Sequence, residues 1–337
     1  MRSNESRQLV GLDVGSRSVK LIELDRAGSA VELKSIAMAI VEDHGAGPGY
    51  QEAIASVIET AGVTTRRVAT AVSGPHVAVR GLQFPRLSRK ELEGAVWYEG
   101  GQVIPFDIRE AYVDYSTLPD ARGGKSEVLF VAARQPEVDA RLELLRSCGL
   151  EPRTVTVDAI ALMNAILDEP ELPETVAVLD IGATTTGFGV ARRGALPFIR
   201  DIDIAGNTYT QAVMNALGVS YAEAEQAKVV EAARNPAVVC AVENVTRQLV
   251  GELSRSLMYY QTRDHGSKAE LICVCGGCSQ IYGLDEVVSA EVGIPVRRWS
   301  ALDQVLIDES RFDRSAVNDL AAFVSLAAAL ARCEDSN

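Results

Sequence analysis

Two short stretches of the sequence repeat one another, and together they limit the folds that the chain can adopt. Leu-Asp-Val-Gly-Ser-Arg-Ser at 12–18 aligns without a gap with Leu-Asp-Ile-Gly-Ala-Thr-Thr at 179–185. Each stretch follows an apolar run and leads into another, which predicts two antiparallel strands joined by a tight loop. A charged turn and a third strand-like run follow each copy. The sequence therefore predicts an internal duplication of a three-strand unit.

The first loop carries groups that suit a phosphate chain with its magnesium ion. Gly15 lets the backbone turn so that successive N–H groups face one anion. Ser16 and Ser18 add hydroxyl donors, and Lys20 adds a positive charge for phosphate oxygens. Asp13 would repel phosphate directly, so we expect it to act through a hydrated Mg²⁺. A surface hairpin with a polar turn explains this stretch alone equally well, but two facing hairpins would hold one phosphate chain from both sides.

Composition argues against several classes of function. The 337 residues carry a net charge of −13, whereas nucleic-acid binding needs a basic footprint. No apolar run reaches the length of a bilayer, and the first six residues lack the apolar core of a signal peptide. Residues 334–337 are acidic, unlike a basic membrane-binding helix. We therefore expect a two-domain or bilobed cytoplasmic protein with no nucleic-acid partner and no direct membrane insertion.

A region of different character separates the two repeats. Ser88 and Glu91 form a capping box for a helix, two strand-like runs follow, and a second helix ends before Gly149. We expect this α-β-β-α unit, residues 87–151, to be a small inserted subdomain. Three of its aromatic residues are more typical of core packing than of a partner surface, namely Trp97, Tyr98 and Phe106.

Start and stop signals also place elements of the second half. Ser220 with Glu223 predicts another capping box. Four further features are expected, namely an N-cap at Asp158, a linker at 170–174, a helix that starts at Ser279 and a last helix over 314–332.

The hairpins resemble those of a known superfamily. Two Asp-x-Gly hairpins on duplicated α/β domains are similar to the actin, Hsp70 and sugar-kinase superfamily. From about Leu9 to Ala331 the chain also resembles the PilM family of type IV pilus assembly proteins, relatives of the division protein FtsA. Stretches outside the hairpins carry this resemblance, namely Leu82–Ser88, Tyr98–Phe106, Val128–Arg134 and Arg200–Asn207.

The resemblance implies a fold and a nucleotide. The fold is α/β, with duplicated actin-like (ribonuclease H-like) domains as lobes 1–170 and 171–337, and residues 87–151 as a small inserted 1C subdomain. ATP would bind between the lobes, with Asp13 and Asp180 holding Mg²⁺ through water. The other hairpin residues would bind phosphates, namely Gly15, Ser16, Ser18, Lys20, Gly182, Thr184 and Thr185.

Two further pairs of residues are candidates for the nucleotide. Gly206 and Asn207 open a helix whose N-terminal N–H groups suit phosphate, although an ordinary helix cap explains them equally well. Glu225 and Lys228 are spaced so that they share a helix face. Alone they are typical of a solvated surface pair, but the resemblance matches them to a Glu-x-x-Lys that holds the ribose and base.

A cysteine cluster lies beside the last candidate. The resemblance assigns the loop Gly276–Gly277–Cys278 to the adenine, with Cys278 where the family has glycine or alanine. Cys275 and Cys278 also have the C-x-x-C spacing of metal and redox sites. Against that, Cys273 and Cys275 share one face of an apolar strand, where cysteine acts as a small hydrophobic residue.

By resemblance, the protein is an ATP-binding scaffold of the pilus machine. It would take up the cytoplasmic N-terminal tail of the inner-membrane protein PilN in a groove beside the inserted subdomain, and so lie at the inner membrane through this partner. No residue stands out as a catalytic base, so we expect slow ATP turnover or none. A small-molecule kinase of the same fold and an FtsA-like division filament stay open as alternatives, as does a homo-oligomer.

Overall fold

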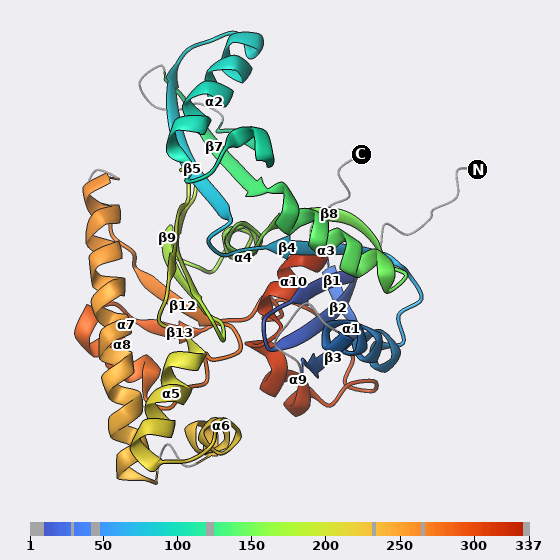
Figure 1. Ribbon diagram of the computed structural model, residues 1–337, viewed down its shortest axis with the longest axis vertical. Helices are drawn as coiled ribbons and strands as arrows, with labels where there is room; N and C mark the ends of the chain where they lie inside the picture. Colours follow the sequence, from blue (N-terminus) through green and yellow to red (C-terminus); the bar gives the residue numbers. More distant parts are fainter. Residues whose placement is uncertain are drawn as a thin grey trace.

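The protein is described here by a computed structural model that covers residues 10–27, 30–41, 48–118, 125–230, 234–263 and 267–332. The expectations for the first residues and for the acidic residues 334–337 lie outside this part of the chain. Figure 1 shows two lobes side by side and a smaller unit above them.

The first lobe contains a five-stranded sheet in the order β3-β2-β1-β4-β8. Strands β1, β2 and β3 are antiparallel neighbours, whereas β1, β4 and β8 run parallel. Helices α1 (Pro48–Ala61) and α3 (Gln135–Ser147) lie near this sheet. The strands are β1 (Val10–Val14), β2 (Ser18–Ala27), β3 (Ala30–Ile40), β4 (Arg67–Val72) and β8 (Glu151–Val157).

The second lobe repeats this topology. Its sheet has the order β11-β10-β9-β12-β13, again with three antiparallel strands followed by parallel ones. This order confirms the duplication predicted from the two hairpins. The strands are β9 (Thr175–Ile181), β10 (Thr186–Arg192), β11 (Phe198–Ile202), β12 (Leu271–Cys275) and β13 (Val296–Arg298).

Four helices accompany the second sheet (Figure 1). The longest, α7 (Pro236–Arg263), buries residues such as Val242, Leu249 and Leu253 in one core with the strands. This spacing of three to four residues places its apolar side chains on one face. The other helices are α5 (Gly206–Leu217), α6 (Tyr221–Val230) and α8 (Leu284–Val292).

The small unit differs from the expected insert. Its sheet is β5-β7-β6, formed by β5 (Val77–Pro85), β7 (Lys125–Arg134) and β6 (Ala111–Thr117), and α2 (Arg89–Val103) packs against it. The unit therefore begins with β5, because Val77–Pro85 pairs with β7 along its length. Helix α3 instead places Leu145 in the core of the first lobe.

Two helices pack across the lobes. Helix α4 (Asp158–Leu167) leaves the first lobe and lies on β10 at Gly189, where an added Cβ would collide with Met163. Helix α10 (Ser325–Ala331) leaves the second lobe and lies on β1 at Gly11. The buried side chains of α10 share one hydrophobic core with Leu24 and Leu33 of the first sheet. The lobes are thus joined by an exchange of helices as well as by the chain between them.

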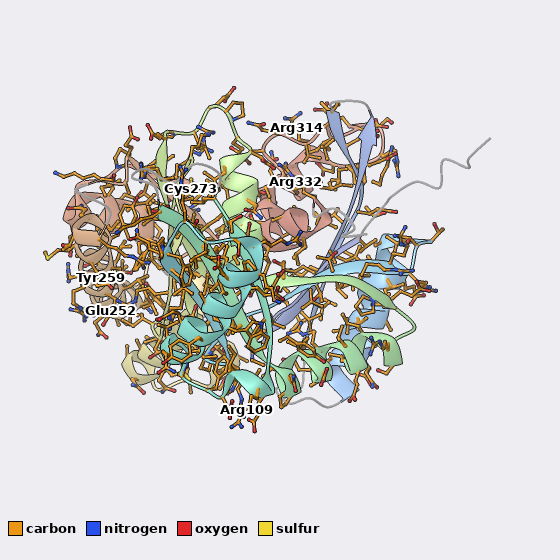
Figure 2. All side chains as sticks on the ribbon, turned by 90° about the horizontal axis from the view of Figure 1, so that it is seen from above. Arg109, Glu252, Tyr259, Cys273, Arg314 and Arg332 are labelled. Carbon is orange, nitrogen blue, oxygen red and sulfur yellow. The ribbon has the colours of Figure 1, made fainter. Side chains whose placement is uncertain are left out.

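The segment before α10 also returns to the first lobe. Leu306 pairs with the edge of β3, through bonds of 2.9 Å to the Leu33 N–H and 2.8 Å to the Val31 carbonyl. At the other end of α10, Arg332 donates to the carbonyl of Ala301 at 2.6 Å (labelled in Figure 2). Leu306 and α10 therefore pack on the first sheet, although the sequence places them in the second lobe.

Three expected elements are wrong in detail. Asp158 is the first residue of α4 and makes no capping bond, because Val157 occupies the N-cap position. The helix expected from Ser279 begins at Leu284, since turns precede it and Gly283 has a positive φ of 70°. The last helix is two helices, α9 (Arg314–Ala321) and α10, that meet at 97°.

Other expectations on surface and membrane have mixed outcomes. Trp97 and Tyr98, expected in a core, are 46% and 70% exposed, whereas Phe106 packs on the core of the small unit. Both capping boxes form, at Ser88 and at Ser220. In the described ranges no single helix is long and apolar enough to cross a membrane. Helices α9 and α10 have the necessary length and apolar composition only when taken together, and the pair is bent.

Candidate functional site

A cavity of about 820 Å³ lies between the two lobes, and every site residue predicted from the sequence lines it. The two hairpin loops meet there, with the Ser16 and Thr184 hydroxyl oxygens 3.4 Å apart. These residues belong to opposite halves of the duplication. The tertiary structure therefore places the two repeated loops face to face, as a shared phosphate site requires.

The two loops have the same backbone geometry. The Gly15 N–H donates to the Ser18 carbonyl at 3.1 Å, and the Gly182 N–H donates to the Thr185 carbonyl at 3.0 Å. An added Cβ on Gly182 would lie 2.8 Å from the Thr185 oxygen, and one on Gly15 would lie 3.2 Å from the Ser18 oxygen. A side chain at 182 would therefore force the turn to shift and one at 15 would crowd it, whereas glycine leaves the backbone open to a close-lying anion.

Each hairpin begins with an aspartate at the end of a buried strand. Asp13 in β1 and Asp180 in β9 are partly exposed, whereas the other residues of both strands are buried. Lys20, which pairs opposite Asp13 in β2, binds its carboxylate at 2.7 Å. Burial disfavours the charged lysine, but the ion pair with Asp13 and the charges of Asp180 and Asp158 together outweigh this effect and raise the pKa of Lys20.

A third carboxylate, Asp158, joins this pair of aspartates in the cavity. Burial raises the pKa of Asp158 to about 6, and Asp13 adds to the effect, while a hydrogen bond from Ser73 opposes it. Burial also raises the pKa of Asp180 to about 7, and Asp158 and Asp13 add to it. The three carboxyl groups therefore repel one another around a single lysine.

This donor set fits a hydrated Mg²⁺ with a phosphate chain. Mg²⁺ prefers oxygen ligands and keeps several waters, and a divalent cation would relieve the repulsion among the carboxylates. Asp13 and Asp180 would hold it through water, and the hairpin N–H groups and hydroxyls would hold the phosphates. Bound Mg²⁺ would neutralise phosphate charge, while Lys20 would orient the chain of phosphates.

Helix α6 lines another side of the cavity with an ion pair of a buried lysine and a partly exposed glutamate. Lys228 binds Glu225 at 2.6 Å and the Thr210 hydroxyl at 3.0 Å, and the lysine side chain is only 4% exposed. Thr210 in turn donates to Glu225. A solvated surface pair would not be buried in this way. The geometry supplies a fixed carboxylate and a fixed cation that could contact a sugar and a base.

The start of α5 braces the second hairpin. The N–H groups of Gly206 and Asn207 donate to the carbonyls of Gly182 and Ala183, at 2.9 and 2.7 Å. An added Cβ on Gly206 would collide with the sulfur of Cys278. These two amides are therefore engaged with the loop rather than directed at a ligand, and they hold the loop against the helix.

The loop after β12 runs close under the second hairpin. Gly276 has a φ of 93°, and an added Cβ there would lie 2.7 Å from the Ile181 oxygen and closer still to Asp180. The Cys278 N–H donates to the Ile181 carbonyl at 2.9 Å. Only a residue without a side chain fits at Gly276, so bare backbone lines this wall of the cavity.

The cysteines act as core residues. Cys273 and Cys275 are fully buried, and burial raises the pKa of both thiols; Figure 2 labels Cys273 within the second lobe. Raised pKa values make thiols poor nucleophiles and poor metal ligands. Among the residues that the structure describes, no group of three or more His, Cys, Asp or Glu could hold a metal ion. The packing therefore favours the hydrophobic interpretation.

Sequence reasoning missed several residues of the cavity. Arg141 of α3 lines it and donates to the Val14 carbonyl at 2.9 Å, which fixes the entry to the first hairpin. Asp158 was interpreted only as a helix cap. A signal for it existed, because β1, β4 and β8 are parallel and Asp158 directly follows β8. In such sheets ligands bind at the carboxyl ends of the strands.

Sequence and structure comparisons place these features among known proteins. A family model described as type IV pilus assembly protein PilM matches residues 11–331. The cell division protein FtsA of Pseudomonas aeruginosa is 23% identical over 345 aligned positions, which cover 86% of this chain and 82% of that protein.

Solved structures share the fold. The structure titled PilM-PilN type IV pilus biogenesis complex aligns with a TM-score of 0.84 and 27% identity, covering 96% of this chain and 97% of that one. The ethanolamine utilization protein EutJ from Carboxydothermus hydrogenoformans aligns with a TM-score of 0.57 at 17% identity, covering 96% and 89%. These alignments confirm the expected α/β fold of duplicated actin-like domains.

Proposed function

This chain belongs to the PilM family of type IV pilus assembly proteins, and from that premise we propose that it binds Mg²⁺-ATP between its lobes and the N-terminal tail of a PilN partner beside its small unit. The facing hairpins carry the first half of this proposal, since Ser16 and Thr184 meet across one cavity. Membership of the family supports a role as a pilus assembly scaffold. Through PilN, the protein would work at the cytoplasmic face of the inner membrane.

Nucleotide binding would hold the two lobes together. A ligand that contacts both hairpins stabilises the arrangement in which they face each other, by an amount that grows with its concentration over Kd. The ion pair of Glu225 and Lys228 would contact the adenosine, and the backbone at Gly276 would lie against the base. Asp13 and Asp180 would bind the Mg²⁺ through water.

Asp158 gives the cavity a candidate for slow ATP hydrolysis. Attack on the terminal phosphate needs a positioned water. Asp158 lines the cavity, and its carboxyl group has a pKa of about 6 and senses the charge of Asp13. A group whose pKa lies near neutral can accept a proton from water. We expect turnover to be slow, because bound ATP would hold the two lobes of the scaffold together and hydrolysis would remove this ligand.

The nucleotide proposal is tested by titrating the purified chain with Mg²⁺-ATP. We expect binding in the wild type and a large loss in Lys20→Ala, with Lys34→Ala as the matched control, since Lys34 pairs with Glu32 outside the cavity. Lys20→Ala leaves Asp13 without its partner and is expected to destabilise the fold. Thr184→Val, which removes one exposed hydroxyl, is therefore measured alongside it. Wild-type protein that binds no ATP would refute the proposal.

The partner proposal concerns the outer strand β6. Tyr112 on this strand is 49% exposed, and its hydroxyl donates to Asp139 of α3 at 3.0 Å. β6 is therefore an edge strand of the small unit that also contacts α3 of the first lobe. An extended tail could add main-chain hydrogen bonds to such an open edge, and the exposed tyrosine would provide a contact of the kind that dominates interfaces.

A synthetic peptide of the PilN tail tests this half by titration in the presence and absence of ATP. Tyr112→Ala should weaken peptide binding at least about tenfold, as a hot-spot tyrosine does. Tyr282→Ala, which removes a tyrosine of similar exposure on the second lobe, should leave it unchanged. If both variants weaken peptide binding equally, or if neither weakens it, the tail does not bind at β6.

A further inference from the structure

Arg17, at the tip of the first hairpin, reaches across the cavity to the second lobe. Its guanidinium carbon lies 4.7 Å from the centre of the Tyr221 ring, which is a cation–π contact. Tyr221 is the first residue of α6, the helix that carries Glu225 and Lys228. Arg17 and Tyr221 both line the cavity. The contact therefore joins the phosphate hairpin of one lobe to the opposite wall formed by the other.

Both partners of this contact are held by other bonds. The Arg17 carbonyl accepts from the Val41 N–H at 2.9 Å, which ties the tip of the hairpin to the end of β3. The Tyr221 hydroxyl donates to the Asn207 side chain at 2.8 Å. The Ser16 and Thr184 hydroxyls meet beside them. Because the fold positions both groups in advance, little conformational entropy remains to be lost when they act on a ligand.

The chemistry of arginine suits this place. A planar guanidinium can stack its face on an aromatic ring while its edge donates to phosphate oxygens, which an ammonium group cannot do. Burial raises the pKa of Tyr221, and Glu225 adds to the effect. The phenol therefore remains neutral at physiological pH, and its ring keeps the π face that attracts the cation.

We propose that Arg17 is a nucleotide clamp, in which the guanidinium lies over Tyr221 and binds the phosphate chain of a nucleoside triphosphate. The proposal rests on the ATP binding proposed above and goes beyond it, since neither Arg17 nor Tyr221 is among the nucleotide-binding residues expected from the sequence. The clamp spans both lobes, so we expect its main effect to be on the rate at which the nucleotide dissociates. Loss of a contact made only after entry changes the dissociation rate more than the association rate.

Stopped-flow displacement of a fluorescent ATP analogue, N-methylanthraniloyl-ATP with Mg²⁺, by excess ATP measures this release rate. We expect Arg17→Ala to release the analogue about tenfold faster, as the loss of one charge-assisted contact implies. Arg17→Lys should lie between wild type and Arg17→Ala, because it keeps the charge but not the planar group. Arg314→Ala is the matched control, since Arg314 pairs with Glu309 outside the cavity and is 63% exposed (labelled in Figure 2).

The ring partner gives an independent measurement. Tyr221→Leu removes the aromatic face and should release the analogue several-fold faster, within the range of about 2- to 30-fold that a cation–π contact supports. Tyr221→Phe removes only the hydroxyl and should lie much closer to wild type. These two variants keep the test valid even if Arg17→Ala does not fold.

Two results would overturn the clamp. One is equal release rates for wild type and folded Arg17→Ala, and the other is equal rates for Tyr221→Leu and Tyr221→Phe. Either result leaves the proposed ATP binding intact, provided that the wild type binds the analogue. If the wild type binds no analogue, the proposed function itself fails, and the clamp fails with it.

Discussion

Gly11 offers the sharpest test of how the two lobes are joined. It lies in β1 directly under α10, and an added Cβ would sit 2.5 Å from the Ala331 nitrogen and still closer to the Ala327 oxygen. Both are backbone atoms, so no side chain can rotate away. Ordinary contact begins near 3.4 Å, so Gly11→Ala requires α10 to retreat by at least about 1 Å.

That movement is costly because α10 is buried over most of its length. Leu326, Ala327, Ala328, Ala329 and Leu330 are all at most 7% exposed. Overpacking of this kind costs about 3 kcal/mol where the backbone must shift. For a chain of 337 residues we expect the thermal midpoint to fall by roughly 4 °C.

The displacement should also reach the cavity. Leu326 and Phe323, at the start of α10 and just before it, line the cavity with the nucleotide-binding candidates. Gly11→Ala should therefore weaken Mg²⁺-ATP binding as well as stability, although residue 11 makes no contact with the cavity itself. A titration at a temperature below the lowered midpoint measures the second effect separately from the first.

Gly94→Ala is the matched control. Gly94 lies within α2, and an added Cβ would meet nothing within 4 Å. Alanine is favoured over glycine by about 1 kcal/mol in a helix, so the control should melt at or above the wild-type temperature. Circular dichroism measures both midpoints. If Gly11→Ala melts with or above the wild type, α10 does not pack on β1 as described.

Three other substitutions test separate parts of the structure. Trp299→Phe removes the donor that binds the buried carboxylate of Glu169 at 2.7 Å, and it should cost about 1–3 kcal/mol of unfolding free energy. Burial raises the pKa of Glu169, and the hydrogen bond from Trp299 opposes this shift because it stabilises the ionised carboxylate. Its removal therefore costs more at a pH where Glu169 is ionised in the folded protein. The urea midpoint of Trp299→Phe should fall further below that of the wild type at pH 7.5 than at pH 5. Ser88→Ala removes the capping box of α2 and should destabilise it by about 1 kcal/mol, seen as faster amide exchange confined to the small unit. Asp158→Asn should lower any ATP turnover at least about 100-fold while Mg²⁺-ATP still binds; unchanged turnover would exclude Asp158 as the base.

Some features were predictable because they depend on neighbours along the chain. The hairpin loops need glycine at the turn, an aspartate before it and hydroxyls after it, and these appear as a repeated pattern. The capping boxes at Ser88 and Ser220 likewise involve residues three apart. Such local rules hold whatever surrounds them.

Other features depended on the packing of distant segments. Ala183 and Asn207 are bonded through their backbones, so the start of α5 braces a loop instead of offering its N–H groups. Trp97 is exposed because α2 packs on its sheet through a different face, with Leu92 and Val96. Neither outcome can be inferred from propensity, because each depends on which element lies alongside.

The sequence by itself determined that this chain is a duplication with two matching polar loops, since turn chemistry and apolar runs are written in consecutive residues. Only the tertiary structure decided that Asp158 joins Asp13 and Asp180, and that Arg17 reaches Tyr221. These groups come from strands, helices and a loop of both lobes, and parallel strand order and helix exchange bring them together. The charge repulsion and the contact across the cavity arise from that proximity, which no single stretch of sequence encodes.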